Sequence, residues 1–130
     1  MSDTPARGLI VSHGHLAEGL IDAVRRIAGP AADGLTSISN DGLSPEELGR
    51  AIDQAAGEGP AVIFVDLQSG SCGTAAFASS RGHPKRAVIC GVNLPIALDF
   101  VFHRDLSLEE LVPRLLEKGR EGIAQLGRPA

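Results

Sequence analysis

The sequence is poor in aromatic residues: its 130 residues include four phenylalanines but no tryptophan and no tyrosine. Positive charge is also in the minority, because 12 lysines and arginines stand against 16 aspartates and glutamates, which gives a net charge of −4. Proteins that bind nucleic acids typically combine a basic surface with aromatic side chains that stack on bases. This composition therefore argues against nucleic acid as a partner.

Cysteines and long hydrophobic runs are scarce as well. The two cysteines, Cys72 and Cys90, form no CxxC pair, which excludes a disulfide framework and a structural zinc site of the usual spacing. No apolar run reaches the roughly 18 residues that a membrane-spanning helix needs, and residues 1–8 lack a signal-peptide pattern. We therefore expect a soluble, cytoplasmic protein that does not insert into a membrane. The sequence predicts no metal ion and no cofactor.

The length of the chain favours a single domain over residues 1–130, with a short polar tail at 127–130. A domain of this size buries roughly two-thirds of the surface that its unfolded chain exposes, which is enough for a hydrophobic core. The sequence shows no internal repeat, linker or low-complexity segment.

Short apolar segments alternate with segments of helical periodicity. Strands are predicted at 9–11, 35–39, 61–66 and 86–92, and helices at 16–28, 45–56, from about residue 74, at 93–102 and at 107–126. Capping residues precede two of the helices, with Ser44 and Ser107 each followed three positions later by glutamate. Pro113 predicts a kink in the last helix. The helix near residue 74 is expected to bury Ala75, Ala76 and Phe77, and Cys90 is expected in the core.

This order of elements predicts an α/β fold, a doubly wound, mostly parallel open sheet with helices on both faces. In such sheets ligands bind beyond the carboxyl ends of the strands, where the strand order reverses. With the strand order 2-1-3-4, the first and third strands are neighbours at that point. His13 follows the first strand and Asp66 ends the third. The sequence therefore predicts an imidazole and a carboxylate facing one crevice.

This pair of side chains has a specific chemical use. A carboxylate that accepts a hydrogen bond from Nδ1 of a histidine leaves the lone pair of Nε2 free to act as a nucleophile. Beside the pair, Ser69, Gly70, Ser71 and Cys72 lead into a predicted helix, whose N-terminus favours an anion such as phosphate. Together these features indicate phosphoryl transfer through a phosphohistidine.

The same residues also have structural explanations. An aspartate at the end of a strand often only caps the turn that follows, and a histidine in a loop is commonly an exposed surface residue. We assign that ordinary role to His83 and His103, and we expect His15 to be exposed. The role of Cys72 stays open, because its reactivity depends on surroundings that the sequence does not show.

Several segments together resemble the mannose-type EIIA domain of the phosphoenolpyruvate-dependent sugar phosphotransferase system (PTS). They are Ile10-Val11-Ser12-His13-Gly14, DLQSGSCGTAA at 66–76, Gly91-Val92-Asn93-Leu94-Pro95, and Glu117-Lys118-Gly119-Arg120-Glu121-Gly122. The resemblance runs from about residue 8 to residue 126 and keeps the order of the segments. The resemblance implies a doubly wound domain that is usually a homodimer and is phosphorylated on His13. It also implies that Asp66 orients the His13 ring and that the loop of Gly70 and Ser71 holds the phosphate.

The resemblance also implies the partners of the protein. The phosphoryl group would arrive from the phosphocarrier protein HPr and leave to a IIB component, which passes it to the incoming sugar. No IIB domain follows in this sequence, so we expect IIB on a separate chain or a regulatory role without it. An apolar rim of Leu16, Leu67 and Leu94 would suit such transient contacts. The loop departs from the family's D-x-x-G-G-S-P pattern, since Ser69 replaces the first glycine and Cys72 replaces the proline.

Other functions fit parts of the pattern. The phosphotransferase subunit of dihydroxyacetone kinase begins similarly, but the segment 91–95 favours the mannose type. Ser71 follows a strand as the nucleophile of a small serine hydrolase would, although the first glycine of G-x-S-x-G is absent and the chain is short for that fold. His13 and His15 resemble a pair of metal-binding histidines found in some barrel enzymes, but such barrels need about 250 residues. A nucleotide-binding module ranks low because neither glycine-rich phosphate motif is present.

Overall fold

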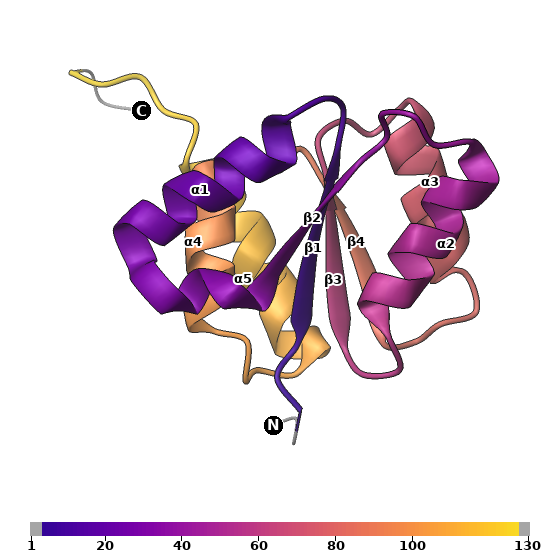
Figure 1. The fold of residues 1–130 in the computed structure, drawn as a ribbon. Coiled ribbons are helices and arrows are strands. Elements are labelled where there is room, and N and C mark those ends of the chain that lie inside the picture. The colour runs from indigo at the N-terminus through magenta and orange to yellow at the C-terminus, as the bar shows by residue number, and fades with distance from the viewer. Residues whose placement is uncertain (1–3, 128–130) are drawn as a thin grey trace.

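The computed structural model describes residues 4–127 and contains four strands and five α-helices in those residues. In chain order these are β1 (Arg7–Ser12), α1 (Leu16–Ala28), the 3₁₀ helix η1 (Gly29–Gly34), β2 (Leu35–Ser39), α2 (Pro45–Ala56), β3 (Ala61–Val65), α3 (Ser71–Ser80), β4 (Arg86–Cys90), α4 (Leu94–Phe102) and α5 (Leu108–Glu121). Figure 1 shows the sheet nearly edge-on between two layers of helices.

All four strands are parallel and lie in the order β2-β1-β3-β4, which confirms the predicted topology. Strand β1 is central and pairs with β2 through residues 8–12 and with β3 through residues 7–11. The order reverses between β1 and β3, because the chain leaves β1 towards β2 on one side and returns to β3 on the other. The carboxyl ends of β1 and β3 therefore lie side by side.

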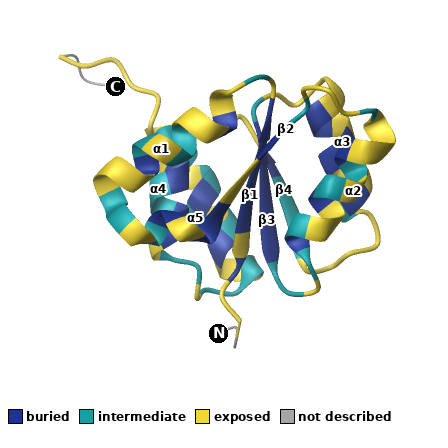
Figure 2. Cartoon of the chain, in the orientation of Figure 1, coloured by how far each residue is buried: buried dark blue, intermediate teal, exposed yellow. Residues whose placement is uncertain are grey.

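The two faces of the sheet carry separate hydrophobic clusters. Figure 2 shows buried segments in the strands and in the helices of both layers. Alternate residues of β3 divide between the two clusters, with Val62 and Phe64 facing α1, α4 and α5, and Ile63 and Val65 facing α2 and α3. All five residues of β3 are fully buried, as a continuous apolar run predicts for a strand covered on both faces. This double covering fixes the sheet rigidly beneath the loops at its carboxyl end.

Sequence signals place most element boundaries correctly. The predicted bounds of α1, β2 and α2 are confirmed, and the Ser44–Glu47 capping box at the start of α2 is present with both of its hydrogen bonds. The last helix ends at Glu121, five residues before the predicted end. Ile123 and Leu126 are 82% and 94% exposed, so they supply no packing that would extend it.

Two burial predictions were wrong. Helix α3 starts at Ser71, and its buried stripe is Cys72, Ala75, Ala76 and Ser79 at helical spacing, which leaves Phe77 outside the stripe and 64% exposed. Cys90 is exposed, because it ends β4, the edge strand of the sheet. Pro113 lies inside α5, which continues past it.

Of the predicted tail at 127–130, only Gly127 belongs to the described residues. Within residues 4–127, no helix combines the length and apolar character needed to cross a bilayer.

Candidate functional site

His13 and Asp66 meet at the carboxyl ends of β1 and β3, as the predicted strand order requires. The Nδ1 atom of His13 lies 2.9 Å from Oδ2 of Asp66, although the two residues are 53 positions apart in the sequence. The side chain of His13 is 44% exposed and that of Asp66 is 10% exposed. One edge of the imidazole is thus held against the protein while the ring remains open to solvent.

The Asp66 carboxylate is fixed by backbone groups as well as by the ring. Its Oδ2 accepts a hydrogen bond from the backbone N–H of His13 at 2.9 Å, and its Oδ1 accepts one from the N–H of Leu67 at 3.0 Å. Burial by itself raises the pKa of Asp66, but the hydrogen bonds from His13 and the charge of its ring outweigh burial and leave the pKa below its usual value.

The low pKa of Asp66 settles which nitrogen of His13 carries the proton. At neutral pH the carboxylate is ionised and only accepts hydrogen bonds, so Nδ1 of His13 must be the donor. The neutral imidazole then carries its free lone pair on Nε2. A carboxylate in this position also stabilises positive charge that develops on the ring.

The loop that carries His13 is anchored to the first turn of α1. The buried hydroxyl of Ser12 accepts a hydrogen bond from the N–H of Ala17 at 2.8 Å, which satisfies one of the free donors at the start of the helix. Gly14 turns the chain with φ 58°, a conformation that favours glycine. These contacts hold the short loop from 13 to 15 in one position above the sheet.

The N-terminus of α3 lies next to the Nε2 edge of the imidazole. Gly70 precedes the helix with φ 97°, and a Cβ built on it would lie 3.5 Å from Cε1 and 3.6 Å from Nε2 of His13. The first N–H groups of a helix have no partner within the helix, and its dipole favours negative charge there. The free lone pair of His13 and an anion-binding helix end therefore face the same space.

The packing of α3 on the preceding loop fixes this arrangement. A Cβ on Gly73 would lie 2.5 Å from the carbonyl oxygen of Gln68, so the first turn of α3 rests directly on the loop backbone. The Ser71 hydroxyl accepts a hydrogen bond from the side-chain amide of Asn40 at 3.1 Å. Ser69 is exposed on the outer part of the loop.

Sequence reasoning missed Asn40. Asn40 follows β2 at the same edge of the sheet, and its backbone N–H donates to the carbonyl oxygen of Ser12. The signal that could have found Asn40 is its place directly after β2, because β2 is the other neighbour of β1 and parallel strands end at the same edge of the sheet.

The thiol of Cys72 lies near Nδ1 of the imidazole, whereas a Cβ on Gly70 would lie near Cε1 and Nε2. The Cys72 thiol is fully buried, and Sγ lies 3.8 Å from Nδ1 of His13. Burial, and after it the nearby charge of Asp66, raises the pKa of the Cys72 thiol. The backbone of Cys72 belongs to the first turn of α3, but its side chain faces the Nδ1 edge that Asp66 also occupies.

The other histidines lie outside this arrangement. His15 is 89% exposed and lies 3.8 Å from Glu18, which confirms the expected exposure. His83 is exposed, and Nδ1 of His103 lies 2.8 Å from the backbone carbonyl of Asp99 at the end of α4. Of the three predicted rim leucines, Leu16 and Leu67 are exposed and Leu94 is half-buried.

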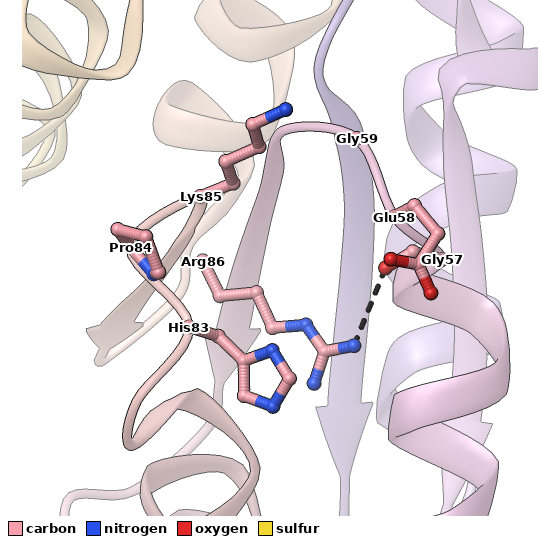
Figure 3. Close-up of a pocket in the computed structure, with 7 residues that line it drawn as sticks. All are labelled: Gly57, Glu58, Gly59, His83, Pro84, Lys85 and Arg86. Carbon is pink, nitrogen blue, oxygen red and sulfur yellow. Dashed lines mark hydrogen bonds between the residues drawn. The ribbon is translucent and has the colours of Figure 1, made fainter.

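A separate hollow lies at the amino ends of β3 and β4, the end of the sheet away from His13 (Figure 3). Its lining includes His83, Lys85 and Arg86. The Arg86 guanidinium donates to the carbonyl oxygens of Gly57 and Ser79 and pairs with Asp53 at 2.6 Å. Arg86 thus joins α2 and α3 to the sheet, and its guanidinium group has a structural role.

The fold and site together define a small, doubly wound α/β protein that presents an oriented histidine beside a helix N-terminus. A family model described as "PTS system fructose IIA component", the mannose-type EIIA family, matches residues 8–115. The chain therefore belongs to the mannose-type EIIA family of the sugar phosphotransferase system.

Solved structures of the same kind align along nearly the whole chain. The mannose/sorbose-specific IIA subunit from Enterococcus faecalis is 27% identical with a TM-score of 0.82, and the alignment covers 98% of each chain. Phosphotransferase system component EIIA from Streptococcus agalactiae is 23% identical with a TM-score of 0.85, covering 92% of this chain and 96% of that one. No curated protein sequence matches the chain.

Membership of this family makes the protein an EIIA phosphocarrier of sugar uptake. The Ser71 hydroxyl pairs with Asn40, whereas the imidazole of His13 pairs with Asp66. The site accordingly lacks the serine–histidine contact on which the serine hydrolase alternative depends.

Proposed function

We propose that His13 is the residue that carries the phosphoryl group, that Asp66 orients it, and that the start of α3 holds the phosphate. The observation that carries this proposal is the 2.9 Å contact between Nδ1 of His13 and Oδ2 of Asp66. It leaves the lone pair of Nε2 beside Gly70, where the helix begins.

In the transfer step, the lone pair of Nε2 attacks the phosphorus of a donor phosphohistidine. A new P–N bond forms as the donor's P–N bond breaks, and the departing imidazole of the donor takes the electron pair. The Nδ1 proton stays on His13 and strengthens its hydrogen bond to Asp66 as the ring gains positive charge. Nothing in this step needs a metal or cofactor, and positioning supplies most of the rate.

The loop before α3 would hold the transferred phosphate. Gly70 allows the backbone to approach Nε2, and the N–H groups of Ser71 and Cys72 are in the first turn of the helix. The hydroxyl of Ser71 is a further donor, held by Asn40. Ser69 contributes from the outer loop through its backbone.

The family supports HPr as the donor and a PTS IIB component as the acceptor. Both must reach the same exposed histidine in turn, and the relay would operate in the cytoplasm. Leu16 and Leu67, which are 50% and 56% exposed on either side of His13, offer apolar contact to both partners.

The family further supports a homodimer, and we assign its interface to the β4 edge. The edge strand β2 exposes Thr36 and Ser37, which suit contact with water. Strand β4 instead has the apolar Val88 half-buried beside the exposed Phe77 of α3. A second copy of this chain would cover these apolar groups.

The first test is phosphorylation by purified phospho-HPr. We expect His13→Ala to abolish incorporation of an acid-labile phosphoryl group, because no other imidazole of the described residues lies beside the start of α3. The matched control is His15→Ala, which removes an imidazole two positions away that is almost fully exposed. Undiminished labelling of His13→Ala would refute the assignment.

A further inference from the structure

Three side chains with metal-binding atoms converge at the site. The His13 ring nitrogen, an Asp66 carboxylate oxygen and the Cys72 sulfur all lie within 4.8 Å of one another. The imidazole and the carboxylate face solvent in part, while the thiol is fully buried. The cluster therefore joins two ligands that solvent reaches to one that it does not.

The separations are close to those of a tetrahedral zinc site. With Zn–N about 2.0 Å, Zn–O about 2.1 Å and Zn–S about 2.3 Å, ligand atoms in a tetrahedron lie roughly 3.4 Å (N to O) and 3.5 Å (N to S) apart. Here Nδ1 of His13 lies 2.9 Å from Oδ2 of Asp66 and 3.8 Å from Sγ of Cys72. To admit the ion, the distance between Nδ1 and Oδ2 must lengthen by about half an ångström, and the ring or the carboxylate must turn so that the oxygen leaves the axis of the Nδ1 lone pair.

The surroundings of the three ligands also fit a metal ion. The two backbone N–H groups that bind Asp66, those of His13 and Leu67, would keep its carboxylate oriented as outer-shell partners do in metal sites. A carboxylate and a thiolate carry two negative charges, which one divalent cation neutralises. Thiolate with imidazole favours Zn²⁺ over harder ions such as Mg²⁺.

We propose that Nδ1 of His13, Asp66 and Cys72 form a Zn²⁺ site, with water as the fourth ligand, and that bound zinc blocks the phosphorylation of His13. On binding, Cys72 releases its thiol proton to solvent. The Nδ1 proton of His13 is displaced and the neutral ring carries its proton on Nε2 instead. The lone pair that would attack phosphorus is then absent, so the zinc form accepts no phosphoryl group.

The site depends on Cys72, which stands where the family's loop pattern has proline. Proline offers no ligand atom, so a chain with that pattern has only the imidazole and the carboxylate at this position. The inhibition by zinc rests on the proposed role of His13, whereas the binding of zinc does not. The two parts can therefore be tested separately.

The binding test uses Co²⁺ as a spectroscopic substitute for Zn²⁺ on the full chain. We expect wild type to bind one Co²⁺ with the near-ultraviolet thiolate-to-cobalt band and the visible bands of a tetrahedral site, and Zn²⁺ to displace it. Cys72→Ser should lose the thiolate band. Its affinity for Zn²⁺ should fall by more than the roughly 10- to 100-fold that removing an outer-shell partner costs, because a direct ligand is lost. Circular dichroism checks that this variant is folded.

Cys90→Ser is the matched control, because Cys90 is the other free cysteine and is exposed on the edge strand. This variant should keep the thiolate band and the affinity of wild type. If wild type shows no thiolate band, or Cys72→Ser keeps it, or Cys90→Ser loses it, the site is not the one proposed.

The inhibition test measures a single transfer from purified phospho-HPr with and without Zn²⁺. We expect zinc at saturation to reduce transfer to wild type and to Cys90→Ser at least tenfold, and to leave the rate of Cys72→Ser close to its own zinc-free value. A metal that binds with the thiolate band but leaves transfer unaffected would overturn the inhibition while leaving the metal site intact.

Discussion

At the scale of single residues, one hydrogen bond sets the chemistry of the site. Asp66 accepts from both the ring and the backbone N–H of His13, so the carboxylate fixes the rotation of the imidazole together with its tautomer. A substitution that removes the negative charge of Asp66 but keeps the size of its side chain tests this orienting role without changing the packing.

We expect Asp66→Asn to slow phosphorylation of His13 by about 10²- to 10⁴-fold, the upper figure being the loss seen when a catalytic triad loses its carboxylate. The asparagine amide can donate to Nδ1 and so favours the tautomer whose proton is on Nε2, where attack is required. Rapid-quench transfer from phospho-HPr measures the rate. Wild-type transfer by a folded Asp66→Asn variant would remove the orienting role.

The low pKa of Asp66 also predicts a dependence of stability on pH. Because the pKa is lower in the folded than in the unfolded chain, where it is about 3.9, Asp66 stabilises the fold above that value. This contribution is lost as the pH falls from about 4 through the lower, folded pKa. The free energies of unfolding of wild type and Asp66→Asn, measured with urea, should therefore differ more at pH 7 than at pH 3. An equal difference at both pH values would contradict the prediction.

At the scale of elements, α3 links the packing of the fold to the site. Its first turn presses on the backbone of residue 68 through Gly73, and the same turn supplies the N–H groups beside Nε2 of His13. A side chain at position 73 must therefore move either the helix or the loop.

We expect Gly73→Ala to lower the free energy of unfolding by about 1–3 kcal/mol, as overpacking usually does, and to slow phosphorylation because the anion site shifts. Gly49→Ala in α2 is the matched control, because a Cβ there meets no atom within 4 Å. It should stabilise the protein by about 0.5–1 kcal/mol and leave transfer unchanged. Urea unfolding measures the stability of each variant, and transfer from phospho-HPr measures its rate of phosphorylation. Equal effects of the two substitutions would show that the contact with Gln68 has no consequence.

At the scale of the whole molecule, the sheet has one polar edge and one apolar edge. The proposed dimer, which would cover the β4 edge, would leave the carboxyl end of the sheet, where His13 lies, open to HPr and IIB. The relay partners and the second copy would thus use different surfaces.

We expect sedimentation equilibrium to give a mass of about 27 kDa, twice the 13.5 kDa of one chain. Phe77→Glu should shift the protein towards monomer, because a charge would be buried in the interface. Phe102→Glu is the control, since Phe102 at the end of α4 is 61% exposed against 64% for Phe77. A monomeric wild type would show that there is no dimer. Dissociation by Phe102→Glu but not by Phe77→Glu would place the interface elsewhere.

The sequence alone determined the fold class, most element boundaries and the pairing of His13 with Asp66. These depend on local signals, namely the continuous apolar strand at 61–65, the Ser44 capping box and the glycines at turns, and on the rule that crossovers are right-handed. Because parallel strands end together, strand order was enough to bring residues 53 positions apart into contact.

Only the tertiary structure decided where each side chain points. The exposure of Cys90 depends on β4 being an edge strand with which no further described strand pairs, and the sequence around Cys90 does not encode that. The place of Cys72 beside the imidazole depends on how the first turn of α3 packs on the loop that follows β3, where Gly73 lies against the backbone of Gln68. A ligand set drawn from residues 13, 66 and 72 has no sequence spacing that would reveal it, because its geometry exists only once β1, β3 and α3 have packed together.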